Sequence, residues 1–234
     1  MPQSYFVWKG TDSRSMGLIS KGNAPLIRAE ERVSHVVVPG RAGDLTLTEG
    51  DDVFEPYIQT VPFSVRGAAN VPGIFDWLCG EGYLSLSGEP GKQQKARVIG
   101  AITLNRVSRN LDNWRGECQF YCQPLKELIN PNPYEITSSS TSITNPGDVE
   151  SRPRITIVGT GDITIRIGTK QLNIYGAESG WKADSETEWV TNSADAPLTG
   201  VWSGTFPTIP VGENTVLFTG NVTKLIFEPR WRYR

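Results

Sequence analysis

The segment Val211–Arg234, VGENTVLFTGNVTKLIFEPRWRYR, decides the fold class of this chain. Within it, Thr215–Thr219 and Val222–Phe227 carry the β-branched and aromatic residues that favour strands. Gly220-Asn221 between them has the chemistry of a two-residue type II′ turn, so the segment predicts a C-terminal β-hairpin. Pro229 ends the second strand because it has no N–H to donate to a ladder. The apolar face of this hairpin has to be covered by other strands.

Short strands fill the chain before this segment. They are expected at Pro153–Ile157, Ile163–Ile167, Leu172–Tyr175, Trp181–Ser185 and Glu188–Thr191. A turn at Gly168–Gln171 is expected between the second and the third of these strands. Short strands at even spacing, with turn residues between them, are typical of a β-sandwich or jelly roll. Such a sandwich would provide the cover that the terminal hairpin requires.

Residues 1–130 predict an α+β unit dominated by strands. Ala96–Arg106 and Trp114–Gln123 are expected to pair antiparallel across a turn at Asn110–Asn113. Alternation in the second strand predicts one face made of Cys118, Phe120 and Cys122. One short helix is expected after Asn70, a good N-cap residue. Its expected apolar face consists of four residues: Ile74, Phe75, Trp77 and Leu78. A further strand is predicted at Val33–Val38.

The clearest break in the chain is Asn130-Pro131-Asn132-Pro133, which reads as a linker. We therefore expect two domains, 1–130 and 131–234. Their combined length of 234 residues suits one large β domain or two ordinary ones.

Composition and charge exclude several classes of function. Charged residues make up 21% of the chain, and residues 1–130 hold 14 Lys/Arg against 14 Asp/Glu. This balance disfavours sequence-independent nucleic-acid binding, which needs a basic excess. No apolar run has the length of a membrane-spanning helix, and the start Met1-Pro2-Gln3-Ser4 lacks the features of a secretory signal. We therefore expect no membrane insertion, and we expect the protein to be made in the cytoplasm.

The three cysteines predict neither a disulfide nor a metal site. Cys118 and Cys122 would lie roughly 13 Å apart along one strand, which is too far for a disulfide. Cys79 and the single histidine, His35, supply no second cluster for zinc. All three thiols are expected to be buried in a protein of a reducing compartment. No phosphate loop or nucleophile elbow is present, so no metal and no cofactor is expected.

Asp184, Glu186 and Glu188 are the strongest candidates for catalysis. On a strand they would share one face with neighbours roughly 7 Å apart, a spacing that overlaps that of inverting glycosidases. An acid/base pair, however, needs unlike environments that split its pKa values, and three carboxylates in a polar turn would not have them. A solvated strand edge is the favoured interpretation, and no enzymatic activity is expected.

Trp181, Trp189 and Trp202 are candidate glycan contacts. They fall on turns and short strands of the predicted sandwich, where aromatic rings can stack on sugars. The favoured interpretation is that they fill cores and subunit interfaces, as most aromatic residues do.

The sequence resembles the distal tail proteins of long-tailed bacteriophages (the siphophage Dit family) nearly from end to end. The N-terminal motifs that carry the resemblance are Phe6-x-Trp8-x-Gly10-x-Asp12-Ser13, Val38-Pro39-Gly40-Arg41-x-Gly43, Ile74–Leu86 and Glu117–Pro124. The C-terminal motifs are Asn145-Pro146-Gly147, Gly159-x-Gly161-Asp162-Ile163, Asp184-Ser185-Glu186, Gly204-x-Phe206-Pro207, Pro210-x-Gly212-Glu213-Asn214, Gly220-Asn221-Val222 and Pro229-Arg230-Trp231-Arg232. Their order and spacing are more specific than any one of them, and they make Asp184-Ser185-Glu186 part of a structural signature.

This resemblance implies a mainly β fold with an N-terminal α+β domain followed by a galectin-like β-sandwich (jelly roll). It implies a virion protein of the tail tip, assembled in the host cytoplasm, whose N-terminal domain forms a hexameric ring. The ring would join the tail tube protein to the tail-tip (tail-associated) protein and to receptor-binding proteins. DNA would pass through the channel without specific binding, which agrees with the charge balance of residues 1–130.

Two other functions remain open from the sequence. The C-terminal sandwich could be a carbohydrate-binding module that holds host cell-wall glycan through Trp181, Trp189 or Trp202. The weakest alternative is a glycan hydrolase built on Asp184 and Glu186.

Overall fold

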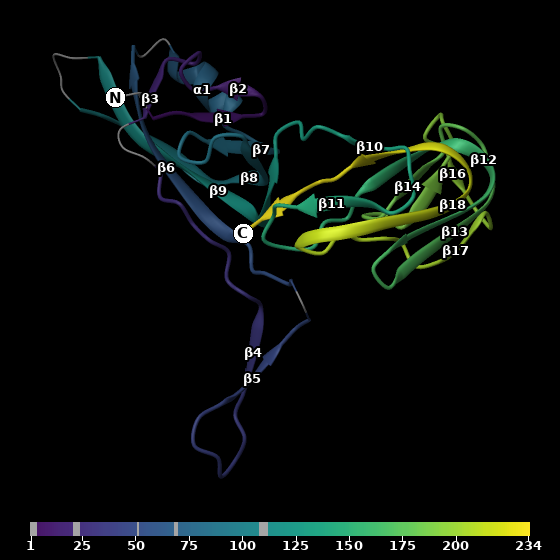
Figure 1. Cartoon of the computed structure of the whole chain (residues 1–234). Helices are drawn as coiled ribbons and strands as arrows, with labels where there is room; N and C mark the ends of the chain where they lie inside the picture. Colours follow the sequence, from purple (N-terminus) through teal and green to yellow (C-terminus); the bar gives the residue numbers. More distant parts are fainter. Residues whose placement is uncertain (1–3, 21–23, 51, 68–69, 108–111) are drawn as a thin grey trace. The chain divides into compact units, whose positions relative to one another are not determined.

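The computed structural model describes residues 4–20, 24–50, 52–67, 70–107 and 112–234. The chain is mainly β, as predicted, and it forms two compact units, Met1–Ile129 and Asn130–Tyr233 (Figure 1). In the part of the chain described, no helix has the length and apolar character needed to cross a membrane.

One antiparallel sheet forms most of the N-terminal unit, with its strands in the order β2-β1-β7-β8-β9-β6-β3. The elements of this unit are β1 (Phe6–Trp8), β2 (Thr11–Asp12), β3 (Leu18–Ser20), β4 (Val33–Val36), β5 (Leu45–Thr48), β6 (Tyr57–Arg66), α1 (Val71–Trp77), β7 (Glu81–Leu86), β8 (Lys92–Arg106) and β9 (Asn113–Leu128). Strands β8 and β9 confirm the predicted antiparallel pair, and each extends beyond its expected bounds. The turn expected at residues 110–113 falls largely outside the described residues.

Alternation along β9 divides the sheet into an inner and an outer face. Cys118, Phe120 and Cys122 are fully buried, as predicted, whereas Tyr121 between them is 40% exposed. The inner face carries the core of this unit, in which Trp8 and Phe120 lie with ring centroids 5.0 Å apart. Period-two burial of this kind is the expected signature of a sheet covered on one side.

The helix α1 covers the inner face of the sheet. Ile74 and the following Leu78 are buried against it, and Trp77 stacks on Phe6 at 5.5 Å between ring centroids. Asn70 occupies the N-cap position, but its side chain donates to the Arg66 carbonyl and makes no cap bond. Placing Phe75 on the apolar face was wrong: it is 40% exposed, because the residue after Ile74 turns away from the sheet.

The cysteines are all free, and their environments differ. Burial raises the pKa of both Cys118 and Cys122 to about 12, which keeps these thiols protonated and unreactive. Cys79 was wrongly predicted to be buried. It follows α1 on the surface, where its thiol donates to the Asp76 carbonyl at 2.9 Å.

The C-terminal unit is built on one nine-stranded antiparallel sheet that curls into two sandwich-like layers. Its strands are β10 (Tyr134–Ile136), β11 (Thr141–Asn145), β12 (Arg154–Ile167), β13 (Lys170–Ala177), β14 (Lys182–Asp184), β15 (Trp189–Thr191), β16 (Pro197–Leu198), β17 (Trp202–Gly204) and β18 (Gly212–Glu228). The chain continues into β19 (Arg232–Tyr233), which is not part of this sheet. The turn expected at Gly168–Gln171 is confirmed between β12 and β13, but it is shorter than predicted because β13 already begins at Lys170.

Two long strands, β12 and β18, run through both layers. The first part of β12 pairs with β14, and its last part pairs with β13. From Val216 to Glu228, strand β18 pairs with β12, with irregularities at Val158/Gly159 and Thr160/Thr164 of β12. A bulge adds a local bend to a strand, so these irregularities carry the chain from one layer to the other.

The predicted terminal hairpin was therefore wrong, because Gly220-Asn221 does not reverse the chain. Gly220 lies inside the continuous strand β18 with a φ of 110°. A β-carbon there would stand 2.3 Å from the carbonyl oxygen of Asp162 in β12. The glycine thus permits the close approach of two backbones at a bend. Because a close approach and a tight turn both require glycine, the sequence alone does not distinguish them.

Candidate functional site

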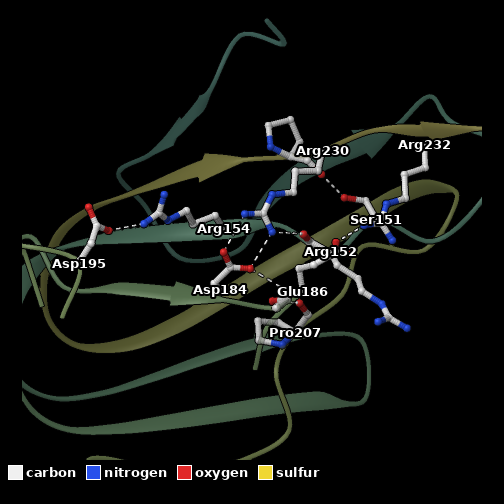
Figure 2. A network of polar contacts seen from close by, with 11 residues as sticks. Ser151, Arg152, Arg154, Asp184, Glu186, Asp195, Pro207, Arg230 and Arg232 are labelled. Carbon is white, nitrogen blue, oxygen red and sulfur yellow. Dashed lines mark hydrogen bonds and ion pairs between the residues drawn. The ribbon is translucent and has the colours of Figure 1, made fainter. Parts of the chain in front are cut away.

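A network of ion pairs fastens the end of the chain to the sandwich (Figure 2). Arg230 donates to both carboxylate oxygens of Asp184 at 2.6 and 2.7 Å, and Arg232 pairs with Glu186. Asp184 ends β14 and Glu186 lies in the turn after it, while Arg230 and Arg232 stand on either side of Trp231. Trp231 between the arginines points inward and is buried, with Tyr134 packed edge-on against it.

Ser185 and Ser151 complete this network. The Ser185 hydroxyl donates to the Pro207 carbonyl at 2.7 Å, and its backbone N–H donates to the Pro153 carbonyl. Ser151 donates to the carbonyl of Pro229, the residue after β18. The motif Asp184-Ser185-Glu186 therefore holds three separate segments of the unit together.

The electrostatics of Asp184 do not suit a general acid. Burial by itself would raise the pKa of this carboxyl, but the hydrogen bonds from Arg230 and from the backbone N–H groups of Glu186 and Thr187 outweigh burial and lower it. A general acid needs the opposite shift. Glu186 is occupied by Arg232, and Glu188 is exposed at a positive φ of 55°. Among the described residues, no three His, Cys, Asp or Glu side chains are placed to hold a metal ion.

Replacing Arg230 by Met is expected to destabilise the C-terminal unit by about 2–3 kcal/mol at pH 7, because Asp184 would keep its half-buried charge without a partner. The folded-state pKa of Asp184 lies below its unfolded value, so the pair stabilises the fold above about pH 4. As the pH falls through the folded pKa, this contribution is lost and the variant should approach the wild type. Urea unfolding followed by tryptophan fluorescence at pH 7 and pH 3 measures the difference.

Lys224 provides a matched control in the same unit. It pairs with Glu135 at 2.9 Å, but Glu135 is 56% exposed, so Lys224→Met should cost no more than about 0.5 kcal/mol. An equal loss in both variants, or a loss for Arg230→Met that is no smaller at pH 3 than at pH 7, would contradict the role given to Asp184.

The three candidate tryptophans lie in different environments. Trp181 is 8% exposed and belongs to the core. Trp202 in β17 packs edge-on against Phe206, with ring centroids 4.8 Å apart. Trp189 in β15 is 46% exposed. Trp189 therefore has the exposed aromatic surface that sugar stacking requires. Trp202 lies in β17, which pairs with β13 and not with β15.

The hairpin β4–β5 is a two-stranded sheet of its own in the N-terminal unit (Figure 1). It confirms the strand expected at Val33–Val38, although β4 ends at Val36. Its register places Val36 opposite Leu45 and Ser34 opposite Leu47, so three apolar side chains share one face. These side chains, Val36, Leu45 and Leu47, are 42%, 37% and 48% exposed. An isolated two-stranded hairpin is marginally stable in water, so this exposed apolar face is a candidate contact surface.

The outer face of the N-terminal sheet carries a second exposed surface. A hollow of about 670 Å³ lies over β7, β8 and β9, lined by aromatic and charged side chains that include Tyr83, Tyr121, Lys95, Arg97 and Glu81. Tyr83 and Tyr121 are 37% and 40% exposed. Tyrosine and arginine are enriched at protein interfaces, and here they stand on rigid strands.

Sequence reasoning missed the basic residues of the C-terminal network. Arg154 and Lys182 both pair with Asp195, and Arg230 pairs with Asp184 across 46 positions of the chain. The alternation of apolar and polar residues along each strand predicts that Arg154 and Lys182 point outward. It does not predict their shared partner Asp195, which comes from the loop between β15 and β16.

Comparison with known proteins adds one decisive observation. The crystal structure of the SPP1 Dit protein, described as a paradigm of the hub adsorption apparatus in phages that infect Gram-positive bacteria, matches the chain with a TM-score of 0.79. The match covers 97% of this chain and 99% of that one, at 16% sequence identity. This chain has a Dit fold. The fold implied by the sequence resemblance is therefore confirmed. No family model matches the chain, and no curated protein matches its sequence significantly.

Proposed function

We propose that this chain is the distal tail hub of a long-tailed bacteriophage, a structural virion protein without enzymatic activity. The similarity to the SPP1 Dit protein over nearly the full length of both chains carries the proposal. Coverage of 97% and 99% leaves no room for a large inserted domain in either chain. A hub of this kind connects the tail tube to the tail-tip protein and to the host-recognition apparatus.

The N-terminal domain (1–130) is proposed to form the ring, with six copies around the tail channel. A closed ring needs heterologous contacts, in which two different surfaces of one chain meet on neighbouring copies. The apolar face of β4–β5 and the aromatic outer face of the sheet are two such surfaces, and both are exposed in the single chain. In a ring, each of these two surfaces would be covered by the neighbouring copy, which removes apolar area from water.

The C-terminal domain (131–234) is proposed to be the galectin-like sandwich of the hub. Its ion-pair network, rather than a catalytic pair, accounts for Asp184 and Glu186. The balanced charge of residues 1–130 suits a ring through which DNA passes, since phosphate contacts would retain the polymer.

Virions of the phage that encodes this chain test the proposed location. Gold-labelled antibodies raised against the purified chain should bind at the distal end of the tail in electron micrographs, and pre-incubation of the antibodies with the chain should abolish the labelling. Label on the capsid or along the whole tail tube, or its absence from virions that infect normally, would overturn the assignment.

A further inference from the structure

The outer face of the C-terminal sheet presents Trp189 at the end of a row of charged side chains. The register pairs Trp189 with Asp184, Asp184 with Arg154, and Arg154 with Glu228. Directly opposed residues point to the same side of a sheet. The residues that alternate with them, Val190, Ala183, Ile155 and Phe227, are completely buried, so the whole row faces outward.

Lys182, Arg230 and Asp195 border this row. Lys182, two residues before Asp184, lies on the same face. Its ammonium donates to both oxygens of Asp195 at 2.9 and 3.0 Å, and Arg154 pairs with the same carboxylate (Figure 2 shows the Arg154–Asp195 pair). Asp184 is held from the other side by Arg230. The polar groups beside Trp189 are thus fixed in place by one another.

The loop between β15 and β16 is built to deliver Asp195. The Asn192 side chain accepts hydrogen bonds from the backbone N–H groups of Ala194 and Ala196 at 3.0 and 2.9 Å. Asp195 itself has a φ of 60°, a conformation that is costly for a residue with a side chain. The loop thereby holds the carboxylate over Arg154 and Lys182, where it presents acceptors next to their donors.

We propose that this surface, made of Trp189, Arg154, Lys182 and Asp195, binds an uncharged saccharide. The apolar face of a sugar ring would stack on Trp189, and its hydroxyls, which both donate and accept hydrogen bonds, would bond to Asp195 and to the two cations. Fixed polar partners around one aromatic ring lower the entropy cost of binding. A saccharide matches a surface that offers donors and acceptors side by side.

Charge and area argue against other occupants. Asp184, Asp195 and Glu228 line the row, and each cation already has a carboxylate partner, so an anionic ligand gains little. A protein partner would need a larger apolar core than the single exposed ring of Trp189 provides. The inference goes beyond the hub function and does not depend on ring formation.

The indole N–H resonance of Trp189 provides a direct readout in the full chain labelled with ¹⁵N-tryptophan, assigned through Trp189→Phe. The probes are methyl glucoside, methyl galactoside, rhamnose and N-acetylglucosamine, each to about 50 mM, which saturates a site of millimolar Kd. At least one sugar should shift this resonance saturably. Trp189→Ala and Asp195→Ala should each weaken the affinity by at least about tenfold, measured on the backbone amides that the sugar shifts in the uniformly ¹⁵N-labelled chain.

Trp202→Phe is the matched control. The side chain of Trp202 packs on Phe206 and is not part of the proposed site, so this variant should leave the affinity unchanged. Glycerol phosphate is the anionic comparison and should leave the Trp189 resonance in place. The proposal is overturned if none of the four sugars shifts that resonance, if glycerol phosphate shifts it more than the sugars do, or if Asp195→Ala binds like the wild type. A ring that forms normally while all sugars fail would remove the saccharide site and leave the hub proposal standing.

Discussion

Gly220→Ala is expected to destabilise the C-terminal unit by at least about 3 kcal/mol, combining an unfavourable backbone conformation with a steric clash. The new β-carbon would stand 2.3 Å from the Asp162 carbonyl oxygen and 3.2 Å from the Cα of Ile163. Both obstacles are backbone atoms of β12, which pairs with β18 along most of its length, so neither can move away cheaply. Urea unfolding of the purified variant, followed by tryptophan fluorescence, measures the loss.

Gly168→Ala separates the two causes of that loss. Gly168 also has a positive φ, 58°, but a β-carbon there meets no atom within 4 Å. This substitution should therefore cost only about 1 kcal/mol of backbone strain. If Gly220→Ala were no more destabilising than Gly168→Ala, the close approach of β18 to β12 would not be the reason for the glycine.

The double substitution Leu45→Asp/Leu47→Asp is expected to abolish ring assembly and leave a folded monomer. Both side chains lie on the apolar face of the β4–β5 hairpin and are already exposed in the single chain. Carboxylates there should leave the thermal midpoint of the chain nearly unchanged, because no core contact is lost. In a ring contact the same charges would be buried without partners, at a cost of several kcal/mol per contact. Mass photometry and circular dichroism report the two effects separately.

Thr48→Asp is the matched control for this face. Thr48 belongs to the same strand and is exposed, but it pairs with Val33 on the opposite face of the hairpin. It should assemble like the wild type. Rings that persist in the double variant, or that fail equally in Thr48→Asp, would exclude the apolar face as the contact.

Local patterns in the sequence predicted much of the fold. Alternation in β9 identified the buried face made of Cys118, Phe120 and Cys122, and turn residues identified the β12–β13 hairpin. These features depend on neighbours in the chain, which a pattern can represent. The resemblance in motif order added the Dit fold, which neither composition nor periodicity could specify.

The errors arose where distant parts of the chain meet. The local pattern around Gly220 predicts a turn. The actual reason for the glycine is the backbone of Asp162, which lies 58 positions earlier in the sequence and is invisible to a local pattern. The bond between Arg230 and Asp184 cannot be predicted from local sequence, because it depends on how the chain leaves the sheet after β18. The prediction that Cys79 is buried rests on a general tendency of cysteines, and it fails because this residue lies on the surface two positions after the last residue of α1.

The oligomeric mass of the purified chain tests the central claim most directly. At concentrations up to about 100 µM, where contacts of micromolar affinity are formed, native mass measurement should give six copies of the 25.8 kDa chain, or about 155 kDa. Electron micrographs of the same sample should show rings with a central opening. A chain that remains a 25.8 kDa monomer over this whole range, or that assembles into open filaments, would contradict the account.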